Sequence, residues 1–405
     1  MDMSSLKSFR NNPQLLLLMM AFVMPLTFSV WNVLLNNFVI DKASFTGAEI
    51  GVLHSLREIP GFLSFTAIFV LLVITEQTFA LISLLCMSIG VAVTGWFPFE
   101  IGLYCTTVLM SVGFHYFETV NQSLTLQWLD KKDSAHFMGK QLAVKGFASI
   151  FAYAMIWLLM TWIGVSYNTV YMLAGGAGIF ICLLIWLAFP TFKHSTTQHK
   201  KLFLRKRYWL YYVLIFFSGA RRQIFVVFAA FLMVEKFGYS VGEISLLFMV
   251  NYVFNLLFAP AIGKWIGRIG ERRALIIEYA GLILVFIGYG LVENSAIAAG
   301  LYVIDHLFFA MAIAMKTYLQ KIGDPQDMAS TAGVSFTINH IAAVVIPALL
   351  GLVWLTSSTL VFLIGAGFAV CSLLLALNIP HDPEPGNEVV RNHLGWANEP
   401  KMSQA

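Results

Sequence analysis

The stretch Gln14–Phe38, QLLLLMMAFVMPLTFSVWNVLLNNF, decides the fold class. It runs for about 25 residues without a charged side chain, and a helix needs about 20 apolar residues to cross the ~30 Å hydrocarbon core of a bilayer. Lys7 and Arg10 precede it. A cleavable signal peptide has an apolar core of only about 7–15 residues. We therefore expect this segment to remain in the mature protein as its first membrane-spanning helix.

The rest of the chain has the same character. Of its 405 residues, 59% are hydrophobic and only 11% are charged, against roughly 25% charged in soluble proteins. The apolar runs are too long for barrel strands, which span a membrane in about 9–11 residues. The sequence therefore predicts an all-α membrane protein of twelve spanning helices, at Gln14–Phe38, Gly47–Val73, Phe79–Phe97, Ile101–Leu129, Phe137–Gly164, Thr169–Phe189, Trp209–Phe237, Val241–Ile266, Ala274–Val292, Ile297–Leu319, Ala329–Leu355 and Leu360–Leu377.

Basic residues in the loops predict the orientation, since cytoplasmic loops carry an excess of Lys and Arg. With twelve spans, one side holds only Lys42 and Lys236. The other holds nineteen basic residues: Lys7, Arg10, Lys131, Lys132, Lys140, Lys193, Lys200, Lys201, Arg205, Lys206, Arg207, Lys264, Arg268, Arg272, Arg273, Lys316, Lys321, Arg391 and Lys401. We expect a multi-pass protein of a cell membrane, of the bacterial inner-membrane type, with both termini cytoplasmic. Short basic loops between apolar runs do not indicate nucleic-acid binding.

The longest and most basic internal loop, Thr191–Arg207, divides the chain in two. We expect a six-helix bundle over residues 1–190, a basic cytoplasmic linker over 191–208 and a second six-helix bundle over 209–380. The remaining segment, 381–405, is polar and rich in Pro, Asn and Glu, and is predicted to be a disordered cytoplasmic tail.

The two halves resemble each other. A shift of 194 residues without a gap places Glu49 on Glu243 and Leu53 on Leu247, and it places the tripeptide 80–82 on the identical tripeptide 274–276. Chance matches between apolar helices are common, but this shift also pairs the second span with the eighth and the third with the ninth. Many transporters are built from internal repeats, with the binding site at the repeat interface.

A motif lies between the eighth and ninth spans, in GKWIGRIGERR at residues 263–273. This junction, the six-plus-six arrangement and the basic central loop resemble the major facilitator superfamily, whose loop motif is G-x-x-x-D-R-x-G-R-R. Four residues match it: Gly263, Arg268, Gly270 and Arg272. Gly267 replaces the acid and Glu271 replaces an arginine.

The resemblance covers nearly the whole chain and implies two pseudo-symmetric six-helix bundles that transport a solute. It also implies that the motif glycines allow close helix approach, and that its basic residues pair with acids on neighbouring helices to hold a gate. The equivalent loop of the first half, residues 75–78, lacks the motif. That departure argues against an ordinary drug exporter, and the sequence assigns no subfamily.

Ionisable residues inside the spans are the main candidates for function. Each costs about 2.5–3.5 kcal/mol at the helix centre on insertion scales, so it normally faces a partner or an aqueous cavity. Five of them lie deep in the second, seventh and tenth spans, namely Arg57, Glu58, Arg221, Arg222 and Asp305. Either they form internal pairs that fix helix packing, or they line a substrate pathway. Because successive helical residues lie ~100° apart, one of the two adjacent arginines is expected to bind substrate and the other to pair with an acid.

Glu118 and Lys145 form a second candidate group, nearer the cytoplasm. Counted from the inner ends of their helices they lie ~16 and ~12 Å deep, at 1.5 Å per residue. We expect them to meet, either as a static salt bridge or as a proton-sensitive latch in the coupling pathway. Other polar residues within spans either hold helices together or line the pathway: Asn32, His115, Asn251, Asn255 and His340.

These residues predict a secondary active transporter that works by alternating access. Deep cations (Arg57, Lys145, Arg221, Arg222) outnumber deep acids (Glu58, Glu118, Asp305) by four to three, which favours an organic anion or an amphipathic solute, with a proton as the candidate coupling ion. A multidrug or cation exporter of the same fold is the alternative, and a membrane sensor or scaffold is a third.

We expect no enzyme, because the sequence has no H-E-x-x-H, nucleophile elbow or Walker motif. We accordingly expect no catalytic residue, cofactor or metal. The expected partners are a small-molecule substrate, protons and the lipid bilayer, and the expected functional form is a monomer.

Overall fold

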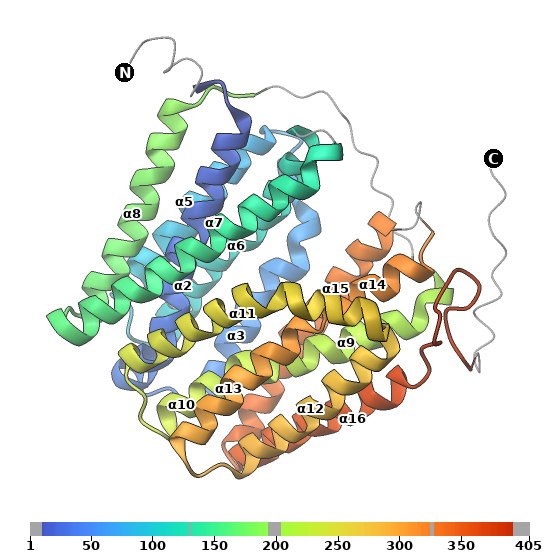
Figure 1. Ribbon diagram of the computed structural model, residues 1–405. Coiled ribbons are helices and arrows are strands. Elements are labelled where there is room, and N and C mark those ends of the chain that lie inside the picture. The colour runs from blue at the N-terminus through green and yellow to red at the C-terminus, as the bar shows by residue number, and fades with distance from the viewer. Residues whose placement is uncertain (1–9, 129–130, 193–203, 325–327, 392–405) are drawn as a thin grey trace. The chain divides into compact units, whose positions relative to one another are not determined.

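The computed structural model describes residues 10–128, 131–192, 204–324 and 328–391 (Figure 1). Within these ranges every extended regular element is a helix, and the one β-bridge is an isolated pair, Glu384 with Asn387. Ten helices of this described part are long and apolar enough to cross a membrane. The predicted all-α membrane fold class is confirmed.

The second and fourth predicted spans are helical but less apolar than the others. The second is divided into α3 (Gly47–Phe62), a 3-10 turn and the short α4 (Ala67–Val70). The break follows Pro60-Gly61, and proline and glycine are common causes of helix kinks. The fourth is α6 (Glu100–Trp128), a helix of 29 residues that carries many polar side chains. Neither is among the ten apolar spans, so the count of twelve crossings stays a prediction.

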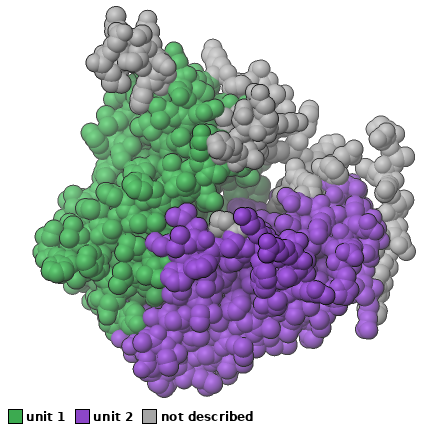
Figure 2. Space-filling view, in the orientation of Figure 1, with its two compact units in different colours: residues 1–198, 238–252 green, residues 199–237, 253–405 purple. Residues whose placement is uncertain are grey.

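The chain forms two compact units (Figure 2). Unit 1 contains residues 1–198 and 238–252, and unit 2 contains residues 199–237 and 253–405. The long helix α11 (Val241–Ile269) begins in unit 1 and continues into unit 2 after Tyr252.

Unit 1 is an all-helical bundle in which α5 packs along α6 and α8, and α2 packs along α7 and α8. Besides α3, α4 and α6, its helices are α2 (Pro13–Ala43), α5 (Glu76–Thr94), α7 (Lys131–Trp157), a π-helical turn at Leu158–Ile163 and α8 (Tyr167–Ala188). Gly175 of α8 faces the backbone of Ser88 on α5 so closely that a methyl group would overlap it. The absence of a side chain at this position therefore lets the two helices approach.

Unit 2 is arranged around α9, α12 and α16, with α15 packed along α9 and α13 along α12. Its helices are α9 (Trp209–Ile224), α10 (Ala230–Glu235), the second part of α11, α12 (Glu271–Leu291), α13 (Ser295–Ala310), α14 (Ile313–Ile322), α15 (Met328–Trp354) and α16 (Ser358–Ala376). Two spans expected as single α-helices are interrupted. A π-helical turn at Phe225–Ala229 separates α9 from α10, and a turn at residues 311–312 separates α13 from α14.

The repeated glutamates detected at a shift of 194 residues have a common structural role. Glu49 accepts hydrogen bonds from the backbone N–H and the hydroxyl of Thr46 at the start of α3, which completes a capping box. Glu243 accepts the equivalent bonds from Ser240 at the start of α11, at 2.8 and 2.7 Å. Each box satisfies orphan donors at a helix N-terminus, so these carboxylates serve helix initiation.

The predicted tail begins at residue 381, and the structure describes it as far as Arg391. There it returns toward the end of α16, since Asn378 accepts a hydrogen bond from the backbone N–H of Arg391 at 2.7 Å. The hydroxyl of Tyr318 on α14 donates to the backbone oxygen of Glu388 at 2.5 Å, and Val389 is buried. The last predicted part of the tail, residues 392–405, and most of the predicted linker, residues 193–203, lie outside the described residues.

Candidate functional site

Arg57 and Glu58 form an ion pair with each other inside unit 1. The Arg57 Nε donates to Glu58 Oε1 at 3.0 Å, and its Nη2 contacts the same oxygen. Both residues are buried, at 7% exposure. The Ser111 hydroxyl on α6 donates to the backbone oxygen of Arg57. The two adjacent charges therefore neutralise each other locally, as the packing alternative predicts.

His115 of α6 lies beside this pair. One of its ring nitrogens and a carboxylate oxygen of Glu58 are within 4.8 Å of each other. His54, one turn before Glu58 on α3, is buried and faces the edge of the Trp31 ring on α2. Both histidines therefore lie close to the ion pair, His115 from α6 and His54 from the preceding turn of α3.

Glu118 and Lys145 meet, as their predicted depths indicate. Lys145 Nζ on α7 donates to Glu118 Oε1 on α6 at 2.6 Å. The two side chains remain partly accessible, at 23% exposure for Lys145 and 37% for Glu118. The contact is confirmed, and its accessibility distinguishes it from the buried Arg57–Glu58 pair.

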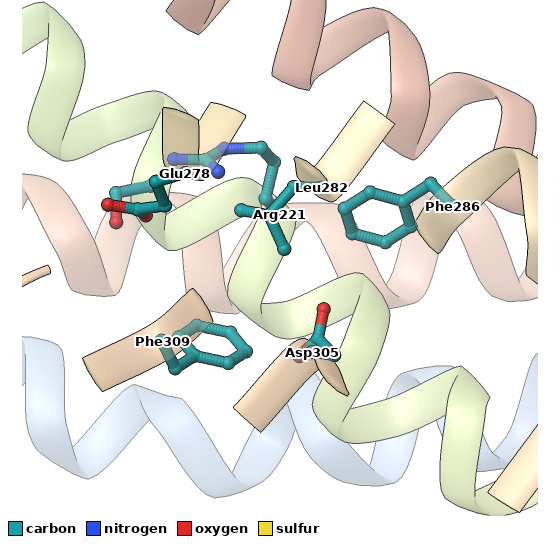
Figure 3. Close-up of a pocket in the computed structure, with 7 residues that line it drawn as sticks. Arg221, Glu278, Leu282, Phe286, Asp305 and Phe309 are labelled. Carbon is teal, nitrogen blue, oxygen red and sulfur yellow. The ribbon is translucent and has the colours of Figure 1, made fainter. Parts of the chain in front are cut away.

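Arg221 of α9 is the best-shielded deep cation of unit 2. It is 3% exposed, its Nε donates to the backbone oxygen of Phe217 at 3.3 Å, and its guanidinium carbon lies 4.4 Å from the centroid of the Tyr279 ring. A guanidinium over an aromatic face is attracted by the ring quadrupole. Figure 3 shows this guanidinium beside the Glu278 side chain of α12.

Glu278 is a functional candidate that the sequence interpretation missed. It is 3% exposed and lies inside the predicted span Ala274–Val292, so a carboxylate within an apolar run was the available signal. It lines a narrow pocket together with Ser218, Arg221, Leu282, Phe286, Asp305 and Phe309. With Glu278 included, the deep acids equal the deep cations, four against four, and the excess of cations counted from the sequence disappears.

Asp305 of α13 is the other carboxylate of this pocket, and it is completely buried at 0% exposure. Neither of its oxygens has a hydrogen-bond partner within the described residues. Arg221 therefore shares one pocket of unit 2 with two acids, and the three side chains come from α9, α12 and α13.

Arg222 differs from its neighbour Arg221 in being exposed, as expected from the ~100° between successive helical residues. The π-helical turn at Phe225–Ala229 follows it closely. Single π-turns inside helices are frequent at functional sites. His306 of α13 has its Nδ1 3.0 Å from the backbone oxygen of Tyr302 and its ring centroid 5.2 Å from that of Phe225.

The predicted polar lining residues differ in their exposure to solvent. Asn251 and His340 are buried, whereas Asn32 is partly exposed and Asn255 is partly exposed as well. His340 Nδ1 lies 2.8 Å from the backbone oxygen of Phe336, four residues earlier in α15. The contacts of these residues are compatible with packing or lining, so their role stays a prediction.

The loop motif adopts a turn that depends on one glycine. Gly270 has φ = +82°, in the left-handed region that L side chains rarely adopt, and α12 begins at the next residue. Glu271, which replaces an arginine of the motif, is buried and accepts from Lys321 Nζ on α14 at 2.8 Å. Arg268 is exposed, Arg272 is partly exposed, and no atom lies within 4 Å of a methyl group built at Gly263. The close approach implied for Gly263 is absent among the described residues. In the ion pair of this junction the motif contributes the acid, Glu271, and the neighbouring helix contributes the base, Lys321.

The equivalent junction of unit 1 uses hydrogen bonds to neutral groups. Glu76, at the start of α5, accepts from the Gln127 amide at 2.7 Å and the Ser123 hydroxyl at 3.1 Å. Its neighbour Gln77 donates to the backbone oxygen of Pro190 and accepts from the backbone N–H of Phe192. These bonds join α5 to α6 and to the end of α8 without the basic residues of the motif.

Comparison with known proteins identifies relatives of this fold. The nucleoside transporter NupG, in a single-residue mutant form, has a structure that superposes with a TM-score of 0.76 at 16% identity, covering 90% of this chain and 99% of that one. A second NupG structure gives 0.74 at 15% identity, covering 90% and 98%. A bacterial homologue of the human lysosomal transporter Spinster, inward-facing and unoccupied, gives 0.65 at 16% identity, covering 92% and 95%.

At these identities the superpositions establish the fold alone. A comparison with curated protein sequences gives no match to this chain. The sequence profile of the Major Facilitator Superfamily matches residues 16–347 and 211–399, which together cover most of the chain. The helical architecture, the ion pairs inside the spans and this match agree, and the protein is a multi-pass membrane protein that belongs to the major facilitator superfamily of transporters.

Proposed function

We propose that this protein is a secondary active transporter that moves a small organic anion across the membrane by alternating access. The observation that carries the proposal is the contrast between Arg221 and Arg222. One arginine is shielded and engaged with Tyr279, and the next presents its side chain at the surface of the helix. An arginine at membrane depth normally faces a wet cavity or a partner.

The chemistry of Arg222 supports an anionic ligand. A guanidinium offers a planar fork of five donors that matches a carboxylate or a phosphate, and it stays charged at all physiological pH values. Accessibility separates Arg222 from the other deep cations, since Arg57 and Arg221 are buried and Lys145 is only partly exposed. A solute that enters a wet cavity can reach an exposed side chain first, so Arg222 is the strongest candidate for the substrate-binding cation.

A neutral polar solute is the second candidate. Four deep acids now balance four deep cations, so the overall charge of the spans favours neither sign. Among the relatives of the fold, NupG is named as a nucleoside transporter. A nucleoside-like solute would be held by hydrogen bonds and ring stacking, with Arg222 as a hydrogen-bond donor only.

The test begins with the purified wild-type protein and a library of organic anions, nucleosides and organic cations. A ligand stabilises the folded state by RT ln(1 + [L]/Kd), about 2.7 kcal/mol at a hundredfold excess over Kd. The ligand that raises the melting temperature is then used in uptake assays with proteoliposomes.

Arg222→Lys and Arg221→Lys form the matched pair of variants for those assays. We expect Arg222→Lys to lose transport while its melting temperature without ligand stays near that of the wild type, because Lys lacks the planar fork. Arg221→Lys should instead lower the melting temperature. Normal anion transport by Arg222→Lys would overturn the assignment of Arg222, and stabilisation by nucleosides alone would favour the second candidate.

A further inference from the structure

The C-terminal end of α14 is attached to two neighbouring elements of unit 2 by ion pairs. Lys321 Nζ donates to Glu271 Oε2 at the start of α12, at 2.8 Å. Arg207 Nη2, just before α9, donates to Asp324 Oδ2 at 2.6 Å. In each pair the side chain from α14 or the residues after it is accessible, at 50% exposure for Lys321 and 37% for Asp324.

A third contact joins α14 to the loop that follows α16, which Figure 1 shows in red. The hydroxyl of Tyr318 donates to the backbone oxygen of Glu388 at 2.5 Å. Tyr318 is 0% exposed and Glu388 is 1% exposed. This hydrogen bond is therefore better shielded from water than either ion pair at this end of α14.

The loop after α16 is closed by its own hydrogen bonds. Asn378 Oδ1 accepts from the backbone N–H of Arg391 at 2.7 Å, and Asn378 Nδ2 donates to the Arg391 oxygen at 3.2 Å. The backbone N–H of Val390 donates to the Asn378 oxygen at 2.9 Å. Compact loops whose ends lie close together, called Ω-loops, are frequently functional. We refer to residues 379–391 of this loop as the strap.

The strap has a defined shape and a packed side. Its apolar residues Ile379, Pro383 and Val389 are buried. Gly386, at its turn, has φ = +95°, a conformation that favours glycine. Among the described residues, no atom outside its chain neighbours lies within 4 Å of a methyl group built at Gly386. The fold of the strap therefore depends on Gly386 through the backbone alone.

The start of α14 is a turn with the geometry of a hinge. At residues 311–312 the backbone bonds to groups three residues back, which interrupts the α-helical pattern. The Met311 N–H donates to the Phe308 oxygen at 2.9 Å, and the Ala312 N–H donates to the Phe309 oxygen at 3.1 Å. Stretches of 3-10 geometry inside a helical span often mark functional hinges. Thus α14 has a hinge at one end and the strap at the other.

We propose that the strap is a latch for α14. Its bond with Tyr318 holds α14 in the position described here, and its release lets α14 pivot at residues 311–312. The strap is the contact best suited to release, because it is a loop, and segments that open locally come from the less stable parts of a protein. Lys321 and Asp324 are already partly hydrated, so separation of their ion pairs costs less than separation of fully buried pairs.

The latch is a property of unit 2 and does not depend on which solute the protein carries. In the transporter proposed above, it controls the last part of the tenth predicted span. The latch is measured without substrate, so failure of the transport proposal leaves it standing. Failure of the latch likewise leaves the transport proposal standing.

Thiol labelling measures the opening of α14 in the purified full-length protein. The reporter is Ile322→Cys, since Ile322 is 0% exposed and is the last residue of α14. The four native cysteines are replaced by alanine. A buried thiol reacts with a maleimide only when its surroundings open. Ala369→Cys, at a 0% exposed position of α16, reports opening of the rest of unit 2.

Tyr318→Phe removes the hydroxyl that donates to the strap and retains the ring. We expect labelling at Ile322→Cys to become about 2- to 10-fold faster, the effect of one hydrogen bond on a local opening equilibrium. Labelling at Ala369→Cys should not change. Tyr289→Phe is the matched control, because Tyr289 is 2% exposed and its hydroxyl donates to the backbone oxygen of Ala298 at 3.3 Å. It should accelerate labelling at neither position.

Gly386→Ala tests the strap without altering a side chain that contacts α14. An L side chain at φ = +95° strains the backbone of the strap, so this variant should also accelerate labelling at Ile322→Cys and leave Ala369→Cys unchanged. Unchanged labelling at Ile322→Cys in either variant would overturn the proposal. Equal acceleration at both cysteine positions would overturn it as well, because α14 would then open only together with the rest of unit 2.

Discussion

Removal of one partner from the Glu118–Lys145 pair measures what this contact contributes to the stability of the folded protein. The variants are Glu118→Gln, Lys145→Met and the double change. Because Lys145 Nζ lies 2.6 Å from Glu118 Oε1, each single variant removes a direct charge-assisted hydrogen bond and leaves the other charge on its helix. The double variant removes both charges, so no uncompensated charge remains.

The expected magnitude follows from the accessibility of the pair. A fully buried pair loses about 3–5 kcal/mol when one partner is removed, and exposed pairs contribute about 0.2–1 kcal/mol. With side-chain exposures of 23% and 37%, this contact lies between those limits, at about 1–2 kcal/mol of coupling. The partial exposure of both side chains is what lowers the value below that of a buried pair.

The assay is thermal unfolding of the four proteins in one detergent, compared as shifts in melting temperature. The exposed pair Lys236–Glu293, at 2.9 Å with side-chain exposures of 35% and 83%, gives the matched control cycle, and its coupling should be near zero. For Glu118 and Lys145 we expect the melting temperature of the double variant to fall by less than the sum of the falls in the two single variants. Shifts that simply add would refute the reasoning, since additivity is the behaviour of independent sites.

Two further predictions concern topology and the loop motif. Reporter fusions after Ser195 and after Ala405 should read cytoplasmic and one after Ala43 external; an internal signal at Ala43 would contradict the count of twelve spans. Lys321→Met should lower the free energy of unfolding by about 1–3 kcal/mol more than Glu271→Gln, measured as a larger fall in melting temperature, because it leaves the carboxylate of Glu271, 4% exposed, without Lys321, which is 50% exposed in their ion pair. Equal shifts for both variants would show that the burial of Glu271 does not determine the stability of this junction.

Much of the fold could be predicted because long apolar runs have one structural solution in a membrane. Backbone groups in lipid must be satisfied within the segment, which leaves the helix for runs of this length. The interruptions were harder to predict. Pro60-Gly61 marks the break after α3, but the turn at residues 311–312 and the π-helical turn at Phe225–Ala229 have no proline or glycine within them.

The candidate site was predictable in part. The Glu118–Lys145 contact follows from depth alone, since both residues lie a similar number of helical turns from the same surface. The acids that share the pocket of Arg221 do not follow from depth, because they depend on which faces of α12 and α13 are turned toward α9. Glu278 carried a signal in the sequence as a carboxylate within an apolar run, but its place in that pocket and the mutual pairing of Arg57 with Glu58 do not follow from depth.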